Sequence, residues 1–153
     1  MRAVIQRVSE ASVTVDDEVV GQIEEGLLVF VGVAHTDSRV DATALADKIV
    51  DLRIFADDHG RPDRSVRNVG GATLVVSQFT LHADTTRGRR PSFTEAASAE
   101  IAEPLIAAFV EDLRSCGVAV EEGRFGAMME VNLRNSGPFT LIVETRDGRI
   151  VST

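Results

Sequence analysis

Two short polar segments hold the residues whose types could do chemistry, Ser77-Gln78-Phe79-Thr80 and Asn135-Ser136-Gly137-Pro138. Main-chain N–H groups at Phe79 and Thr80 could stabilise an oxyanion in an acyl-transfer reaction. The Gly-Pro step allows a sharp turn, and the bond before Pro is where cis peptides occur. A plain turn between two strands is the commoner meaning of such a step. The alternative is a rigid backbone device that presents carbonyl oxygens to a ligand.

Side-chain catalysts are scarce in the rest of the chain. The available hydroxyl, thiol and imidazole groups include Ser77, Thr80, Ser92, Thr94, Cys116, His35, His59 and His82. No Gly-x-Ser-x-Gly elbow is present. If Thr80 and His82 lie in one strand, they share a face and could pair as nucleophile and base, but no third orienting group is evident. A small-ester hydrolase that uses this pair is one open hypothesis.

The sequence contains no pattern for a metal or a cofactor. Its three His are scattered, and neither Cys-x-x-Cys nor His-x-x-x-His spacing occurs. No Gly-rich loop of the P-loop or dinucleotide-binding type is present. We therefore expect no metal and no cofactor, and a chemistry that works through backbone donors and acceptors.

The charge distribution bears on nucleic-acid binding. The formal net charge of −8 argues against such a partner at first sight. Residues 61–90, however, carry six Arg and two Asp, a local balance of +4. A local basic zone can hold a phosphate backbone because potential acts over about one Debye length. Arg87, Arg89 and Arg90 are the candidate phosphate contacts, and an ordinary solvated face is the alternative.

These segments must be positioned by a β-rich fold. Alternating or continuous apolar runs predict strands at residues 2–8, 12–15, 18–23, 27–34, 72–79, 118–121, 127–133, 139–144 and 149–152. Asp16-Asp17 and Asp147-Gly148 supply hairpin turns. We expect an α+β fold, with one β-rich domain over residues 1–153, an antiparallel or mixed barrel-like sheet and two main helices.

The two helices are predicted from apolar periodicity. The first begins after the N-cap candidates at residues 35–38 and ends near Leu52. The second covers residues 94–116, and Pro104 predicts a break or kink near residues 102–104. Residues 56–71 have no apolar period and predict a long loop.

The composition favours a cytoplasmic protein. Cys116 is the single cysteine, which excludes an internal disulfide framework and suits a reducing compartment. Met1 leads into an alternating segment, so we expect no signal peptide. No stretch approaches the roughly 18 apolar residues that span a bilayer, so we expect no membrane partner.

Four segments together resemble one known family. They are Met1-Arg2-Ala3-Val4-Ile5-Gln6-Arg7-Val8, Ser77-Gln78-Phe79-Thr80-Leu81, Gly88-Arg89-Arg90-Pro91-Ser92-Phe93 and Asn135-Ser136-Gly137-Pro138. Their types and order are similar to those of the bacterial D-aminoacyl-tRNA deacylases, the D-Tyr-tRNA deacylase type, from Met1 to the C-terminus. Two departures are His82, where the family often has Tyr, and Phe139, where Val is usual.

The resemblance implies a homodimeric hydrolase. Such an enzyme would cleave the ester between a D-amino acid and the terminal ribose of tRNA, and would admit glycyl-tRNA as well. In this family the Gly-Pro peptide is cis and reaches into the partner subunit's pocket. Gly137 and Pro138 would then aim carbonyl oxygens at the substrate, so that an L side chain clashes and a D side chain points outward.

The resemblance also assigns the remaining site residues. Ser77, Gln78, Phe79 and Thr80 would line the reacting end, with Phe79 near the terminal adenosine. Phe125 and Met129 would wall the pocket, Arg7 would brace the Gly-Pro loop, and Arg87, Arg89 and Arg90 would contact tRNA phosphates without reading sequence. A water assisted by the ribose 2′-OH would attack, rather than the Thr80 hydroxyl. A non-catalytic RNA-binding dimer stays as a second alternative.

Overall fold

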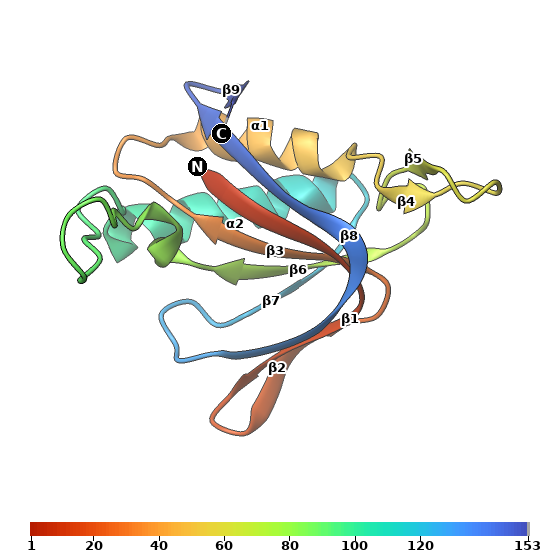
Figure 1. The fold of residues 1–153 in the computed structure, drawn as a ribbon, viewed down its shortest axis with the longest axis horizontal. Helices are drawn as coiled ribbons and strands as arrows, with labels where there is room; N and C mark the ends of the chain where they lie inside the picture. The colour runs from red at the N-terminus through yellow and green to blue at the C-terminus, as the bar shows by residue number, and fades with distance from the viewer. Residues whose placement is uncertain (153) are drawn as a thin grey trace.

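A computed structural model describes residues 1–152 and shows one mixed seven-stranded sheet. The strands are β1 (Arg2–Val15), β2 (Glu18–Ile23), β3 (Gly26–Gly32), β6 (Ala72–Ser77), β7 (Ala119–Glu122), β8 (Glu130–Arg146) and β9 (Arg149–Val151). They lie in the order β7-β6-β3-β1-β8-β9, and β2 pairs with β1 (Figure 1). The pairs β3–β6 and β6–β7 are parallel, and all other pairs are antiparallel.

The sheet curls because β1 changes partner along its length. Residues 2–8 pair with β3, whereas residues 11–15 pair with β2, and β8 follows β1 on its other edge throughout (Figure 1). The alternation of buried and half-buried side chains is interrupted near Glu10, where the register with β8 also shifts. Register shifts of this kind bend a strand and increase its twist. The α+β class with a curled mixed sheet and two main helices is therefore confirmed.

Two helices cover one face of the sheet. α1 (Arg39–Val50) and α2 (Ala99–Ser115) bury apolar residues at helical spacing, and α2 does so with Ala102, Ile106, Phe109, Val110 and Leu113. These side chains meet Ile5, Leu27, Val29 and Val31 of the sheet in the larger hydrophobic cluster. No helix within residues 1–152 is long and apolar enough to cross a membrane.

The second helix differs from its prediction. It begins at Ala99, not at residue 94, because the preceding segment extends β3 instead: Ala97 N–H donates to Val33 O, and Ala34 pairs with Ala96. The helix also runs through Pro104 without a break. Pro104 lies in the second turn on the exposed side, so water can satisfy the carbonyl that loses its helical donor.

The smaller hydrophobic cluster fills the inside of the curl. Val8, Val13 and Ile23 meet Leu28, Leu74 and Val76 there. Closure of the curl depends on Gly21 of β2, because a β-carbon at that position would lie 2.5 Å from the carbonyl oxygen of Glu122. A side chain on residue 21 would therefore force β2 and β7 apart.

Three predicted segments have a different local structure. The strand expected at residues 72–79 ends at Ser77, and a short 3-10 helix, η1 (Phe79–His82), follows. The predicted loop 56–71 overlaps the small hairpin of β4 (Phe55–Ala56) and β5 (Pro62–Arg64). The strands expected at residues 127–133 and 139–144 form one continuous strand, β8, that includes the Gly-Pro step. The plain-turn interpretation of that step is therefore wrong.

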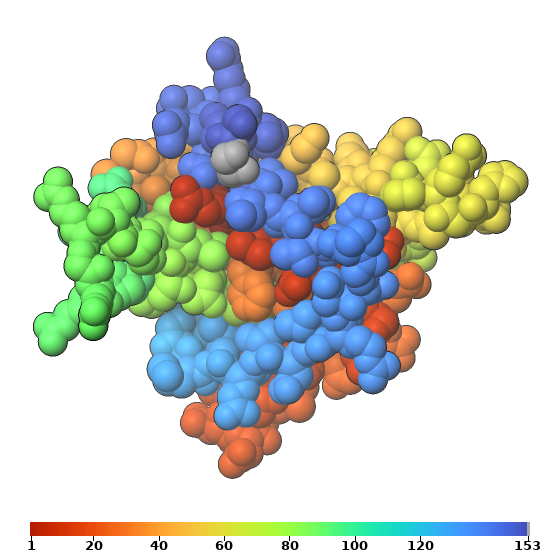
Figure 2. Space-filling view, in the orientation of Figure 1, coloured from red at the N-terminus to blue at the C-terminus, as the bar shows by residue number. Residues whose placement is uncertain are grey.

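Figure 2 shows two segments that project from the body at opposite ends. The loop after η1, in green, projects on one side, and the β4–β5 hairpin, in yellow, projects on the other. Strand β8, in blue, crosses the front between them.

Candidate functional site

A cavity of about 560 Å³ opens at the carboxyl ends of the parallel strands β3 and β6. Its lining comes from the ends of β3 and β6, η1, the first half of α2 with a residue before it, the β7–β8 loop and the start of β8. The lining residues are Val31, Val33, Val76, Ser77, Gln78, Phe79, Thr80, Ala97, Ala99, Ala102, Ile106, Phe125, Gly126, Ala127, Met128, Met129 and Val131. Six of the predicted site residues, Ser77 to Thr80 together with Phe125 and Met129, therefore meet in one cavity.

The polar edge of this cavity is built by the backbone at Ser77–Thr80. Gln78 N–H donates to Val31 O at 2.8 Å, which fixes the end of β6 against β3. Leu81 N–H donates to Gln78 O at 3.2 Å and closes the turn. Within residues 1–152, no main-chain carbonyl accepts a hydrogen bond from the N–H group of Phe79 or Thr80. Two free main-chain donors beside a cavity are an arrangement that can stabilise a developing oxyanion.

The Thr80 hydroxyl is held by a neighbour that is not a base. Gln78 Nε2 donates to Thr80 Oγ1. An amide cannot accept the proton that a nucleophilic hydroxyl must lose. Among residues 1–152, no charged side chain lines the cavity, so the lining of the described chain supplies no acid or base. The arrangement suits catalysis by main-chain donors on a bound water.

The rim of the cavity is aromatic. Phe79 is 57% exposed, and its ring meets Phe93 edge-on, with centroids 5.2 Å apart. Phe125 and Met129 contribute apolar surface from the β7–β8 loop. An exposed ring that is held in place by a second ring is a surface on which a flat heterocycle can stack.

His82 belongs to a different cavity. It lines a second space of about 640 Å³ with Asp37, Glu95 and Glu144, while Thr80 lines the first. The two residues are in η1, where positions two apart do not share a face as they would in a strand. Burial lowers the pKa of His82. The hypothesis of a Thr80–His82 nucleophile–base pair is therefore wrong.

The Gly137–Pro138 peptide is cis and lies in a bulge of β8. Between the pairs Gln6↔Thr140 and Val8↔Asn135, β1 advances by two residues and β8 by five. The extra residues of β8 must leave the plane of the sheet. The Gly-Pro step therefore protrudes from an otherwise continuous ladder.

Arg7 fastens this bulge from the neighbouring strand. Its Nε donates to Ser136 O at 3.1 Å, and its Nη2 donates to Gly137 O at 3.1 Å. Its Nη1 donates to Ile54 O, which ties the bulge to the segment after α1. Arg7 is thus close to the Gly-Pro loop, as the resemblance implies.

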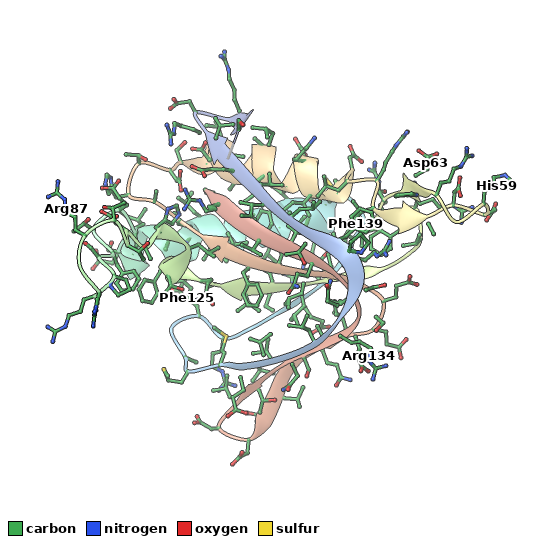
Figure 3. All side chains as sticks on the ribbon, in the orientation of Figure 1. His59, Asp63, Arg87, Phe125, Arg134 and Phe139 are labelled. Carbon is green, nitrogen blue, oxygen red and sulfur yellow. The ribbon has the colours of Figure 1, made fainter. Side chains whose placement is uncertain are left out.

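The bulge does not line the cavity of its own chain. Arg7, Gly137 and Pro138 are absent from the lining. Figure 3 shows Phe125 at the β7–β8 loop and Phe139, next to Pro138, at the distant bend of β8. The structure therefore places the two predicted halves of the site at different positions on the chain.

The predicted basic zone separates into two groups. Arg61, Arg64 and Arg67 each lie within 3.4 Å of an Asp carboxylate. Arg87, Arg89 and Arg90 are exposed and have no carboxylate within 4.0 Å among residues 1–152. Figure 3 shows Arg87 at the opposite end of the molecule from His59 and Asp63. Only the second group offers uncompensated charge.

Comparison with known proteins decides the family. The family model described as D-Tyr-tRNA(Tyr) deacylase matches residues 4–144. A protein named D-aminoacyl-tRNA deacylase from Roseiflexus sp. (strain RS-1) is 59% identical over 145 residues, which cover 95% of this chain and 94% of the relative. The chain belongs to the D-aminoacyl-tRNA deacylase family.

A second relative is also similar in sequence, and two solved structures share the fold. A D-aminoacyl-tRNA deacylase from Bacillus cereus (strain AH187) is 53% identical over 146 residues, covering 95% of this chain and 100% of the relative. The solved structure titled "c-Myc DNA Unwinding Element Binding Protein" has a TM-score of 0.90 at 37% identity and covers 95% of this chain and 99% of that chain. A structure titled as a probable eukaryotic D-amino acid tRNA deacylase shares the fold, with a TM-score of 0.80 at 17% identity and coverage of 92% of this chain and 97% of that chain.

Some residues around the site were not predicted from the sequence. Ala97, Ala102 and Ile106 line the cavity, but in the sequence they are ordinary apolar positions. Asn135 Nδ2 donates to Arg7 O at 3.0 Å and to Phe139 O at 3.2 Å, so it closes the base of the bulge. Asn135 stood within the quoted motif and could have been selected as a polar side chain beside a Gly-Pro step.

Metal binding is not supported by any cluster in the described part of the chain. Within residues 1–152, no group of three or more His, Cys, Asp or Glu side chains could hold a metal ion. In the second cavity, Arg2 forms an ion pair with Glu144 at 2.9 Å and so compensates part of the acidic charge there.

Proposed function

We propose that this chain hydrolyses the ester bond of D-aminoacyl-tRNA and releases the free D-amino acid and tRNA. The observation that carries the proposal is its identity of 53–59% with proteins named D-aminoacyl-tRNA deacylase, over at least 95% of its length. The uncharged cavity with two free main-chain donors is suited to this reaction. The aminoacyl group of the substrate needs a pocket, and the terminal adenosine needs an aromatic surface beside that pocket.

In the proposed reaction, a water attacks the ester carbonyl and the ribose oxygen leaves. The N–H groups of Phe79 and Thr80 stabilise the oxyanion, while the ribose 2′-OH assists the water. The bond between the carbonyl carbon and the ribose oxygen breaks. One proton of the water passes to the ribose oxygen, the other passes to solvent, and the amino acid leaves as a carboxylate. Phe79 stacks near the terminal adenosine, and Phe125 and Met129 bound the pocket.

The chiral selection is proposed to come from Gly137 and Pro138 of a second copy. The bulge that carries them lies away from the cavity of its own chain, which supports a partner subunit as the source of this half of the site. Their carbonyl oxygens would face the aminoacyl group, where an L side chain clashes and a D side chain points outward. Glycine has no side chain to clash, so glycyl-tRNA should also be a substrate.

The sheet offers a face for this second copy. Val4 pairs with Phe30 on β3 and with Ile142 on β8, on the face opposite the helices, and Ile142 is 54% exposed. Gln6 and Thr140 form an exposed cross-strand hydrogen bond of 3.1 Å beside them. An apolar centre with a polar border is typical of a protein–protein interface.

The decisive experiment compares D- and L-aminoacyl-tRNA that carry the same amino acid. We expect the purified protein to release the D-amino acid much faster than its L counterpart. Equal rates, or tRNA binding without any release, would refute the proposal, and the second result would favour the RNA-binding dimer.

The shared site has its own test, because two inactive variants should complement each other. Phe79→Ala removes the aromatic rim, and Gly137→Glu blocks the bulge. Random exchange of subunits leaves about one quarter of the sites intact in a symmetric dimer. Mixed subunits should therefore recover about one quarter of the activity. No recovery, with heterodimers shown to form, would place each site within one chain.

A further inference from the structure

The guanidinium group of Arg7 is surrounded by the Gly-Pro region on its edge and on its face. Its edge donates to the carbonyl oxygens of Ser136, Gly137 and Ile54. Its central carbon, Cζ, lies over the ring of Phe139, 4.6 Å from the centroid. Among residues 1–152, no carboxylate lies within 4.0 Å of Arg7. The ring and three carbonyl dipoles are therefore the groups that hold this cation.

The edge and face contacts serve different purposes. A guanidinium group donates hydrogen bonds in its plane and stacks on an aromatic ring through its face, so the two kinds of contact do not compete. Hydrogen bonds to Ser136 O and Gly137 O fix where the edge points. The ring of Phe139 fixes the plane itself.

Phe139 is well placed to fix that plane because the ring is itself anchored. It is partly buried and packs against the larger hydrophobic cluster under the helices. Asn135 Nδ2 bridges the carbonyl oxygens of Arg7 and Phe139, so the backbones on the two sides of the contact are held together. The ring therefore transmits the rigidity of the core to Arg7, and Arg7 transmits it to Gly137 O.

We propose that Phe139 is a positioning residue for the Gly137–Pro138 segment and helps to set the discrimination between D and L substrates. It acts through Arg7 and does not touch the substrate. This inference rests on the proposed function, because discrimination is the property that it explains. Without the ring, Arg7 would keep its charge but would reach more rotamers, and the orientation of Gly137 O would be less strictly defined.

The test uses two substitutions of the same residue. Phe139→Leu keeps an apolar side chain but has no aromatic face, whereas Phe139→Tyr keeps the face. We expect Phe139→Leu to lower the ratio of kcat/KM for D- over L-aminoacyl-tRNA by roughly fivefold to tenfold, given the strength of a cation–π contact. Phe139→Tyr should keep the ratio. A purely structural role would change the melting temperature without changing the ratio.

A double substitution and a second measurement complete the test. Arg7→Lys should lower the ratio by itself, and adding Phe139→Leu to it should cause little further loss, because both changes remove one interaction. Amide hydrogen exchange of residues 134–140 should be faster in Phe139→Leu and unchanged in Phe139→Tyr.

Two results would overturn the inference, namely an unchanged ratio in Phe139→Leu and unchanged exchange in that variant. The exchange measurement needs no substrate, so it judges the role of Phe139 even if the wild-type protein releases no D-amino acid. A wild-type protein that releases no D-amino acid would refute the proposed function only.

Discussion

The β-carbon that Gly137 lacks would lie 4.0 Å from Oδ1 of Asn135, and among residues 1–152 no other group outside its two neighbours is nearer. The fold of the described chain therefore leaves open space at the position that the proposed filter needs to keep free. Any requirement for glycine at residue 137 must come from something outside the chain, either the substrate or the partner subunit.

Gly137→Ala should therefore affect function and not folding. We expect an unchanged melting temperature and a loss of at least about tenfold in kcat/KM for D-aminoacyl-tRNA, since a small steric misfit at a reacting centre is costly. Kinetics on D- and glycyl-tRNA substrates and thermal unfolding check both parts. Full activity with full D-over-L selectivity in this variant would mean that the assigned role is wrong.

Gly21→Ala is the matched control for that variant. Its added carbon would lie 2.5 Å from the carbonyl oxygen of Glu122, so the two strands must move apart. We expect this variant to lose about 1–3 kcal/mol of unfolding free energy, as overpacked sites do. Denaturant unfolding measures the loss, and the pair of variants should separate stability from activity.

The unpaired arginines should set the affinity for tRNA. Replacing Arg87, Arg89 and Arg90 together by Ala should raise KM with little change in kcat, because phosphate contacts position the substrate without taking part in chemistry. The slope of log affinity against log salt should become shallower by about 2–3. Steady-state kinetics and binding at several KCl concentrations measure both effects.

The matched control replaces the other three arginines, Arg61, Arg64 and Arg67, which are paired with Asp57, Asp58 and Asp51. We expect this variant to keep both KM and the salt slope. If both triple variants weaken binding equally, the effect is one of net charge and not of a defined contact surface.

His82 should make stability depend on pH below neutrality. Burial is the main cause that lowers its pKa, against a raising contribution from the backbone hydrogen bond with Gly32. As the pH falls, His82 therefore binds its proton at a higher pH in the unfolded chain than in the folded chain. Stability should be complete above about pH 6.5 and fall as the pH drops from there through the lower folded value.

His82→Asn should reduce this fall in stability and should leave deacylation near pH 7.5 nearly unchanged. Urea unfolding at several pH values and a rate measurement at pH 7.5 are sufficient. A complete loss of activity in the folded variant would show that the imidazole takes part in the reaction after all.

Asp41 should give a second pH dependence, in acid. The residue is 2% exposed, and burial alone would raise the pKa of its carboxyl group. Hydrogen bonds from Gly148 N–H, Ser38 N–H and the Ser38 hydroxyl reverse this and lower the pKa overall. Its contribution to stability is therefore present above about pH 4 and is lost as the pH falls through the folded value.

Asp41→Asn should lower the unfolding free energy by about 1–3 kcal/mol at pH 7, because an amide cannot replace all three accepted hydrogen bonds. The difference in unfolding free energy between this variant and the wild type should be smaller below about pH 4 than at pH 7. Denaturant titrations at pH 7 and in acid measure it. An equal difference at both pH values would contradict the assignment.

The sequence was sufficient for most elements because their signals are local. Periodicity predicted the strands at residues 18–23 and 72–79 and the first helix, and their observed bounds, including the end of β6 at Ser77, lie within a few residues of these predictions. The same locality explains the misses. Residues 94–98 are of helical composition, but Ala97 hydrogen-bonds to Val33, which lies far away in the chain.

The candidate site divides in the same way. Residues 77–80 were expected to lie together at one site, and they line the cavity together because a strand end and the turn that follows it are adjacent in the chain. The bulge at Gly137–Pro138 could not be predicted as part of a continuous strand, since Pro argues locally against a ladder and only the pairing with β1 restores it. The stacking of Arg7 on Phe139 likewise depends on a register that the sequence does not display.

The step of five residues against two in the pairing of β8 with β1 has a consequence for engineering. Strands β1 and β8 pair on both sides of the bulge. The protruding residues are therefore an insertion between two paired segments of the sheet. Such an insertion can be redesigned while the paired segments stay constant. Libraries restricted to residues 136–138 would then explore which stereochemistry an ester hydrolase accepts, on a scaffold whose stability is set elsewhere.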